Sequence, residues 1–255
     1  MGAVIRWGWA LCVAVAVAGC GGAARSGDGS VAQRETVLVL AASSLTEAFA
    51  EIEEAFEAAN PRFDVQLSLA GSPSLVVQVE EGIPADVVAT ASTATMARAA
   101  TAGALADEPV PFATNRLVIA VPVGNPEGIS GPADLARPEL LVGVCAAGVP
   151  CGDAATEVLD RAGVEAAIDT YEPNVRALLA KLVDGELDVV LVYETDVLAG
   201  LGSVEAVELS EDVTVTATIA PLVDAPHPDG ARAFVAFVIS PQGRRILTDN
   251  GFALP

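Results

Sequence analysis

Short apolar runs that alternate with helix-like segments are the feature of this chain that most restricts its fold. Residues 37–41 form a wholly apolar run, which is typical of a strand buried on both faces of a parallel sheet. Residues 44–47 then have the spacing of a helix capping box, and apolar residues follow at helical spacing up to the Asn-Pro pair at 60–61. This alternation predicts an α/β protein whose parallel strands are flanked by helices.

The same alternation continues to the end of the chain. Ser72 and Pro73 are expected at the N-cap and the first position of a second helix. The further strands that we expect lie at residues 65–69, 85–89, 117–121, 140–144, 187–193 and 213–219, and the further helices at 72–82, 96–103, 153–162, 174–184, 231–239 and 241–250. This order predicts two α/β halves of about 110 residues each, with the strands near residues 117 and 217 crossing between them. Ligands in such folds bind at the carboxyl ends of strands, where helix N-termini converge.

The first residues are typical of an export signal. Arg6 supplies a positive charge before an apolar run that is too short to span a bilayer, and residues 1–19 are interpreted as a signal peptide. Residues 17–20 read Val-Ala-Gly-Cys, which resembles a bacterial lipoprotein box and predicts lipid on Cys20. A general signal peptidase site near Ala18 is the alternative. Residues 20–35 are expected to be a flexible tether, so the mature chain would be anchored to the outer face of the cell membrane.

Charge excludes several classes of function. The chain has 34 acidic side chains against 13 Lys plus Arg, a formal net charge of −21. Nucleic-acid phosphates are bound by a surplus of Lys and Arg, so a nucleic-acid partner is not expected. Anionic lipid surfaces repel such a chain as well. A content of 52% hydrophobic residues excludes intrinsic disorder.

Two of the four cysteines remain once the signal is removed and Cys20 is modified. Cys145 and Cys151 would then lie in an oxidising compartment, where a disulfide that brackets residues 146–150 is the favoured interpretation. A thioredoxin-like redox pair is the alternative, but the spacing is not C-x-x-C and no basic group is adjacent. The cysteines and the single His lack the spacing of a zinc site, so neither a metal cation nor a cofactor is expected.

Four expected helix starts offer donors for an anion. They are Ser44, Ser72, the turn at Cys151 and the Asn-Val pair at 174–175. The first N–H groups of a helix are unpaired and carry partial positive charge, and serine hydroxyls add further donors. Taken singly, each is also explained by helix capping, so spacing alone leaves the anion hypothesis open.

Several short motifs carry a resemblance to a known family. They are Ala41-Ala42-Ser43-Ser44-Leu45, Ala70-Gly71-Ser72-Pro73-Ser74-Leu75 with Gln78, Gly82-Ile83-Pro84-Ala85-Asp86-Val87, Asn174-Val175-Arg176-Ala177-Leu178 and Val192-Tyr193-Glu194-Thr195-Asp196. Through them, residues 37–255 resemble the molybdate-binding proteins of ABC importers. The resemblance implies a two-lobed, type II periplasmic-binding-protein-like fold, in which each lobe is a mostly parallel sheet flanked by helices and two crossover strands join the lobes. Residues 36–116 plus 221–255 would form lobe 1, and residues 117–220 would form lobe 2.

The resemblance also implies five contacts to a dehydrated tetrahedral oxyanion. Ser44 and Ser72 would each give a hydroxyl and a backbone N–H. Cys151 and Val175 would each give a backbone N–H, and Tyr193 its phenolic O–H. Cys151 stands where the family commonly has Ala, and a disulfide there would stiffen that wall of the site.

The donor set favours particular anions. Molybdate and tungstate are fully deprotonated near neutral pH and need only donors, whereas phosphate keeps a proton and would need a carboxylate acceptor. None of the five positions is Asp or Glu, which disfavours phosphate, while sulfate would have to be excluded by cavity size. Glu47, Glu194 and Asp196 are interpreted as a capping partner and solvated loop charges.

The implied function is a receptor that captures molybdate or tungstate and delivers it to a membrane permease with its cytoplasmic ATPase, acting as a monomer. Receptors for another small anion, such as sulfate or an organic acid, and a lipoprotein with a purely interaction role are alternatives. A serine-dependent hydrolase with Ser44 as nucleophile would need a positioned base. The single His227 lies in a Pro-bounded loop and is expected at the surface, and the common catalytic motifs are absent from the sequence, so we do not expect an enzyme.

Overall fold

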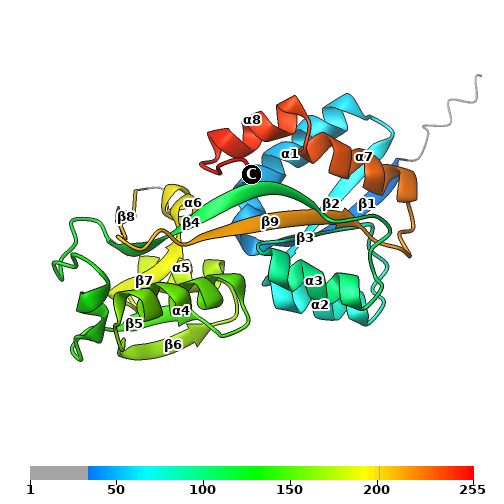
Figure 1. Ribbon diagram of the computed structural model, residues 1–255. Helices are drawn as coiled ribbons and strands as arrows, with labels where there is room; N and C mark the ends of the chain where they lie inside the picture. The colour runs from blue at the N-terminus through cyan, green and yellow to red at the C-terminus, as the bar shows by residue number, and fades with distance from the viewer. Residues whose placement is uncertain (1–33, 201) are drawn as a thin grey trace, which may run out of the picture. The chain divides into compact units, whose positions relative to one another are not determined.

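A mixed β-sheet whose strands come from distant parts of the chain organises the structure (Figure 1). The computed structural model describes residues 34–200 and 202–255. The strands are β1 (Glu35–Ala42), β2 (Phe63–Ala70), β3 (Val87–Thr90), β4 (Val110–Pro122), β5 (Val142–Cys145), β6 (Ile168–Glu172), β7 (Val189–Tyr193), β8 (Val204–Val207) and β9 (Thr214–Pro221). Their order is β2-β1-β3-β9-β4-β7-β5-β6, with β8 paired to β4.

Parallel pairing is confined to the two ends of this order. β1 pairs in parallel with β2 and β3, and β5 pairs in parallel with β6 and β7. Between them, β9 is antiparallel to β3 and β4, and β4 is antiparallel to β7. The expectation of an α/β fold with parallel strands flanked by helices is therefore confirmed.

Helices cover both faces of the β1–β3 region (Figure 1). The helices are α1 (Thr46–Ala59), α2 (Ser72–Glu80), α3 (Thr93–Thr101), α4 (Pro150–Ala162), α5 (Val175–Val183), α6 (Glu194–Ala199), α7 (Pro228–Val238) and α8 (Pro241–Asp249), with 3-10 turns η1 (Ser43–Leu45) and η2 (Pro132–Ala136). Val37 and Val39 pack in one core with Phe49 and Phe234, which come from α1 and α7, while Leu40 packs on the opposite face with Leu75 of α2. Because alternate side chains of a strand point to opposite faces, burial on both faces explains the wholly apolar run.

A separate core is built only from residues between Leu117 and Val213. We refer to β1–β3, α1–α3, α7 and α8 as the first part, and to β5–β8 and α4–α6 as the second part. β4 belongs to both, because Phe112 packs in a core of the first part and Ile119 in that of the second. β4 and β9 thus connect the two parts, as expected for the strands near residues 117 and 217.

Three regular elements were not expected from the sequence. β6 and β8 are short strands with several exposed positions, so neither has the continuous apolar run by which buried strands are recognised. α6 has only six residues, too few for a helical period to repeat. β4 is longer than expected and begins at Val110, because it continues into the sheet of the first part.

Two expectations about helix starts were wrong. α1 is capped at Leu45 without a side-chain hydrogen bond, so Ser44 and Glu47 form no capping box, and Ser44 instead lies in the 3-10 turn η1. The N-cap of α2 is Gly71, so Ser72 is already inside the helix and its hydroxyl bonds elsewhere. Each cap therefore lies one residue from its expected position, toward the C-terminus for α1 and toward the N-terminus for α2.

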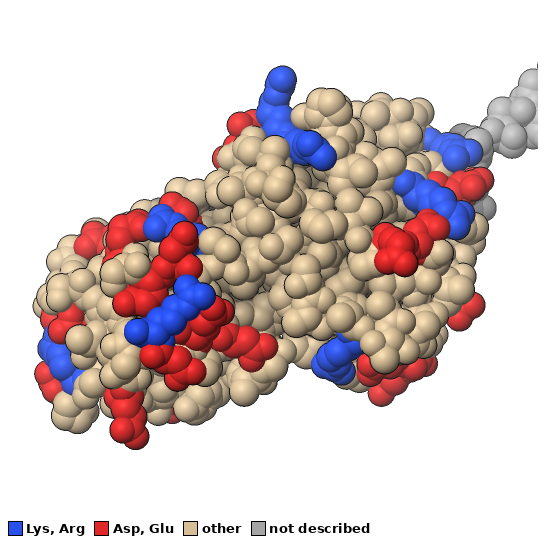
Figure 2. All heavy atoms as spheres, in the orientation of Figure 1, with Lys and Arg blue, Asp and Glu red and all other residues tan. Residues whose placement is uncertain are grey.

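The predictions for the signal peptide at 1–19, for lipid on Cys20 and for the tether up to residue 33 lie outside the described residues. Among the residues that are described, we find no helix with the length and apolarity needed to cross a bilayer. Acidic side chains gather over the left-hand part of the face shown in Figure 2, where Figure 1 places α4 and the strands β5–β8. The middle of that face is largely uncharged.

Candidate functional site

One small pocket collects all five residues that the sequence predicted to bind an anion. Its cavity volume is about 10 Å³, and it lies where elements of the first and second parts meet. Its lining is Ala42, Ser43, Ser44, Gly71, Ser72, Ala91, Val149, Pro150, Cys151, Asn174, Val175 and Tyr193. Sites for drug-sized ligands occupy about 300–1,000 Å³, so this pocket is far too small for such a ligand. The lining contains no charged side chain.

Helix N-termini converge on this pocket from both parts. Ser72 begins α2, Cys151 is the second residue of α4 and Val175 begins α5, so each lies in a first helical turn. The N–H groups of a first turn have no partner within their helix and carry partial positive charge. The pocket therefore presents backbone donors that can bind an anion without a cationic side chain.

The Ser72 hydroxyl is oriented by the backbone of the first part. Its Oγ accepts a hydrogen bond of 3.0 Å from the backbone N–H of Ala91, which follows β3, and the side chain is buried. A hydroxyl that accepts from the protein keeps its own proton to donate. Ser72 is thus prepared as a donor toward the pocket.

Tyr193 supplies a second hydroxyl donor from the end of β7. Its side chain is 1% exposed, and its hydroxyl has no hydrogen-bond partner among the described residues. Burial raises the pKa of this phenol well above its ordinary value, and the charges of Asp196 and Asp153 raise it further. The phenol therefore keeps its proton, and a buried donor without a partner is what an incoming anion would satisfy.

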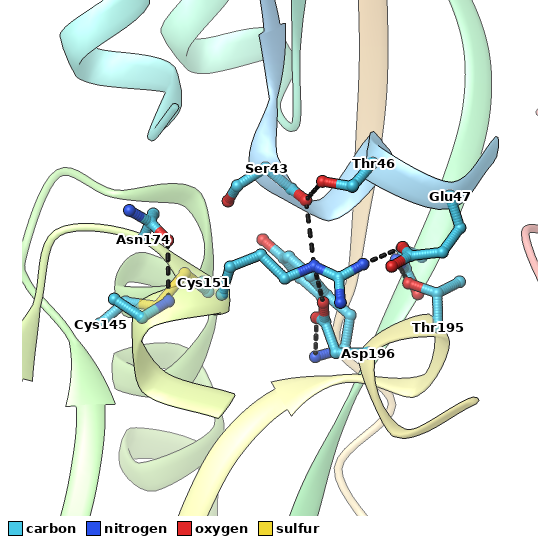
Figure 3. A network of polar contacts seen from close by, with 12 residues as sticks. Ser43, Thr46, Glu47, Cys145, Cys151, Asn174, Thr195 and Asp196 are labelled. Atoms are coloured by element: carbon cyan, nitrogen blue, oxygen red, sulfur yellow. Dashed lines mark hydrogen bonds and ion pairs between the residues drawn. A yellow bond between two sulfur atoms is a disulfide. The ribbon is translucent and has the colours of Figure 1, made fainter. Parts of the chain in front are cut away.

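A disulfide fixes the wall that contains Cys151. It joins Cys145, the last residue of β5, to Cys151 with a Cα–Cα distance of 5.6 Å, so the predicted pairing is confirmed. The next residue, Gly152, is required by the same close approach, because a Cβ there would lie 2.2 Å from the carbonyl oxygen of Ala146. Together they hold the first turn of α4 against the strand end (Figure 3).

Sequence reasoning expected Asn174 at the start of its helix but gave no role to three other lining residues, Gly71, Ser43 and Ala91. The Asn174 side chain caps α5 by accepting a 2.9 Å hydrogen bond from the N–H of Ala177. Gly71 allows the two parts to touch, since a Cβ at this position would lie 2.4 Å from the Pro173 carbonyl oxygen. Ser43 and Ala91 complete the wall of the first part. Gly71 and Ser43 stand inside the motifs of the resemblance, but their roles depend on contacts that no local pattern encodes.

The expectation that Glu47 and Asp196 are a capping partner and a solvated charge was wrong. Asp196 is fully buried, and its Oδ2 accepts a 3.1 Å hydrogen bond from the backbone N–H of Tyr193. Burial raises the pKa of Asp196 to about 7, against the lowering effect of Arg176 and of that hydrogen bond. Glu47 pairs with Arg176 from across the pocket, whereas Glu194 is half-exposed, as expected, and lies 3.3 Å from Arg116.

His227 lies in the loop before α7 and is partly exposed, as expected of a loop at the surface. Its side chain is 34% exposed with Nδ1 3.6 Å from the Asp86 carboxylate, and its backbone N–H donates to the same carboxylate at 2.6 Å. It is not part of the pocket lining, which holds no His, Asp or Glu that could act as a base toward Ser44. The geometry at the pocket is therefore that of a binding site built from donors.

A wider hollow does not share these properties. It has a volume of about 360 Å³ beside the C-terminal ends of α2 and α3, and includes Glu80, Ile83 and Asp224. Helix C-termini carry partial negative charge and disfavour anions. The small pocket is therefore the better candidate.

Comparisons with known proteins give consistent matches. Residues 37–253 match the family described as bacterial extracellular solute-binding protein. The chain is 41% identical over 249 residues to the molybdate-binding protein ModA of Mycobacterium tuberculosis, covering 96% of this chain and 95% of that protein.

Two solved structures share the fold. The periplasmic molybdate-binding protein of Azotobacter vinelandii matches with a TM-score of 0.75 at 16% identity, over 86% of this chain and 99% of that chain. The sulfate-binding protein SubI of Mycobacterium tuberculosis matches with a TM-score of 0.77 at 20% identity, over 86% of each chain. At these identities the likeness concerns the fold alone.

Proposed function

The chain belongs to the bacterial extracellular solute-binding proteins, and on that premise we propose that it captures molybdate or tungstate and delivers it to an ABC transporter. The 41% identity to a molybdate-binding protein over nearly the whole chain supports this ligand class. No cofactor is needed for such a role, because the oxyanion itself is the cargo.

The observation that carries the proposal is the donor set of the small pocket. The Tyr193 hydroxyl is buried without a partner and shares the pocket with the first turns of α2, α4 and α5. Its lining has donors but no carboxylate, which suits a dianion without protons. Phosphate carries a proton near neutral pH and would leave that proton without an acceptor, at a cost of about 1–3 kcal/mol for a buried unpaired group.

In the proposed complex, the oxyanion is held by Ser44, Ser72, Cys151, Val175 and Tyr193. The serines give hydroxyl and backbone donors, Cys151 and Val175 give backbone N–H groups, and Tyr193 gives its phenol. Ser44 and Ser72 belong to the first part of the structure and the other three to the second. One ion would therefore bridge both parts and favour their closed arrangement.

We take residues 36–116 plus 221–255 and residues 117–220 as the two lobes that close on the ligand. β4 and β9 would act as the hinge, because they are the strands that pass between the cores. A ligand that binds only the closed form shifts the equilibrium toward it. The closed form would then be recognised by the membrane permease, whose ATPase supplies the energy of transport.

The proposal includes an exported monomer that is held at the outer face of the membrane through lipid on Cys20, with no catalytic activity of its own. The bacterial extracellular family supports export. The parent chain should incorporate radiolabelled palmitate and Cys20→Ala should not, as measured by autoradiography of the immunoprecipitated protein. Absence of label in the parent chain would contradict the anchor.

Isothermal titration of the compact unit from Gln33 to Pro255 tests the ligand. Molybdate and tungstate should bind, while sulfate and phosphate give no heat. Binding of sulfate in place of molybdate would retain a receptor but assign it another anion. Silence for all four ions would contradict the proposed function.

A further inference from the structure

The side chain of Arg176 connects the two parts of the structure beside the pocket. It is the second residue of α5, directly after Val175, and its Nε donates to the carbonyl oxygen of Ser43 at 3.2 Å. Its Nη2 forms an ion pair with the carboxylate of Glu47 in α1. Figure 3 shows Ser43 and Glu47 on neighbouring turns of the first part, with Asp196 of the second part below them.

Asp196 holds the guanidinium from its own side. Its Oδ1 lies 3.7 Å from the Arg176 Nε and has no hydrogen-bond partner among the described residues. Asp196 is fully buried, and the Arg176 side chain is only 24% exposed. A buried charge is costly unless it is paired, so the ionised form of Asp196 holds the Arg176 guanidinium from the second part.

The carbonyl of Ser43 is held from two directions. Besides the Arg176 bond, it accepts a 2.7 Å hydrogen bond from the Thr46 hydroxyl (Figure 3). Both donors fix η1, the turn that presents Ser44 to the pocket. Arg176 thus reaches from the second part to the backbone of the turn that carries a proposed ligand contact.

We propose that Arg176 is a positioning residue that latches the closed arrangement, with Glu47 as its partner across the cleft. The proposal rests on the proposed function for its ligand, but the latch is built from the chain's own side chains. Its contacts to Ser43 and Glu47 require the two parts to be together. Opening must break them, so the latch slows ligand release.

Simple electrostatics and the latch predict opposite effects on ligand affinity when the charge of Glu47 is removed. A carboxylate near an anion site repels the anion, so its neutralisation should tighten binding or leave it unchanged. The latch predicts weaker binding, because neutral Gln no longer pairs with Arg176. The sign of the change therefore separates the two explanations.

Glu47→Gln is the test variant, and Glu194→Gln is its matched control. The two glutamates have the same exposed fraction, 44%, and each pairs with an arginine, but Glu194 contacts Arg116, which belongs to β4. Both variants remove one negative charge near the pocket, and neither residue lines it with its carboxylate in the proposed complex. Thermal unfolding of both variants should match that of the parent protein.

Release of radiolabelled molybdate, chased with unlabelled molybdate, gives the dissociation rate. Glu47→Gln should raise this rate about two- to fivefold, whereas Glu194→Gln should leave it unchanged. Added salt should accelerate release from the parent protein but not from Glu47→Gln, because salt screens a partly exposed ion pair. A purely structural role for Glu47 would not produce this loss of salt dependence.

Small-angle scattering of the ligand-free proteins tests the latch without the ligand. Glu47→Gln should increase the radius of gyration relative to the parent and to Glu194→Gln, because the open form becomes more populated. If molybdate does not bind the parent protein, the proposed function fails while this comparison still tests the latch. Equal radii together with equal release rates for both variants would overturn the proposal, as would tighter binding by Glu47→Gln.

Discussion

Tyr193→Phe should change ligand affinity and the stability of the free protein in opposite directions. Tyr193 is 1% exposed, and its hydroxyl has no hydrogen-bond partner among the described residues. An unpaired buried polar group costs about 1–3 kcal/mol, so its removal should not destabilise the free protein. The free energy of unfolding of the free protein should rise by an amount between zero, if water reaches the hydroxyl in an open form, and that full cost.

In the molybdate-bound protein, loss of the Tyr193 hydroxyl should be unfavourable. A hydrogen bond to a charged group contributes about 1.5–3 kcal/mol, which corresponds to about 10- to 150-fold in affinity. Removing the hydroxyl should therefore weaken molybdate binding by one to two orders of magnitude. For a chain of this size, each kcal/mol moves the unfolding midpoint by about 2–4 °C, so the stabilisation by ligand should shrink visibly.

Isothermal titration gives the affinity, and thermal unfolding with and without molybdate gives the stability. Tyr171→Phe is the control, because Tyr171 lies in β6 with 63% of its surface exposed and is not part of the pocket lining. Neither quantity should change in that variant. The reasoning is refuted if Tyr193→Phe leaves the affinity unchanged, or if it lowers the stability of the free protein by about 1 kcal/mol or more.

Three further substitutions test other parts of the site. Ser72→Ala should weaken molybdate binding by about 1–3 kcal/mol and, unlike Tyr193→Phe, also destabilise the free protein, because the N–H of Ala91 loses its acceptor. Calorimetry measures the affinity and thermal unfolding the stability. Unchanged affinity would remove Ser72 from the site. Gly71→Ala places a Cβ 2.4 Å from the Pro173 carbonyl oxygen, so closure of the two parts should cost about 1–3 kcal/mol. The affinity for molybdate should fall, while the free protein unfolds at its usual temperature. Unchanged affinity would show that the two parts need not approach so closely. Because the pKa of Asp196 is raised from 3.8 to about 7, the folded protein retains a proton that the unfolded chain releases. Its contribution to the free energy of unfolding therefore falls by about 1.4 kcal/mol per pH unit as pH rises from about 4 to 7, and Asp196→Asn should remove this slope; parallel pH profiles for the two proteins would contradict the assignment.

Local pattern was sufficient for the elements that are buried on both faces. The run at 37–41 predicted β1 because α1 and α7 cover one side of it and α2 the other. β6 and β8 were not predicted because both strands are partly exposed and mix polar with apolar residues. Their formation depends on pairing with β5 and β4, which is a non-local contact.

The same distinction applies to the site. Ser44, Ser72 and Tyr193 stand in recognisable motifs, and the fold brings them into one pocket. Asp196 was misjudged because its neighbours in sequence are polar, while its burial comes from packing at the end of β7 beneath Arg176. Whether a charged residue is solvated or buried depends on the segments that cover it in the fold. The residues next to Asp196 in the sequence do not identify those segments.

The position of β9 has a consequence for when this protein can fold. β9 lies between β3 and β4, so the sheet of the first part has a missing central strand until residues 214–221 have been synthesised. The early strands can pair among themselves, but their core also needs Ala217 and Ile219 of β9 and Phe234 of α7. Contacts so distant in sequence form slowly and late. The topology therefore delays stable folding of the first part until the chain is nearly complete, whereas the core between Leu117 and Val213 can form before β9 and α7 have been synthesised.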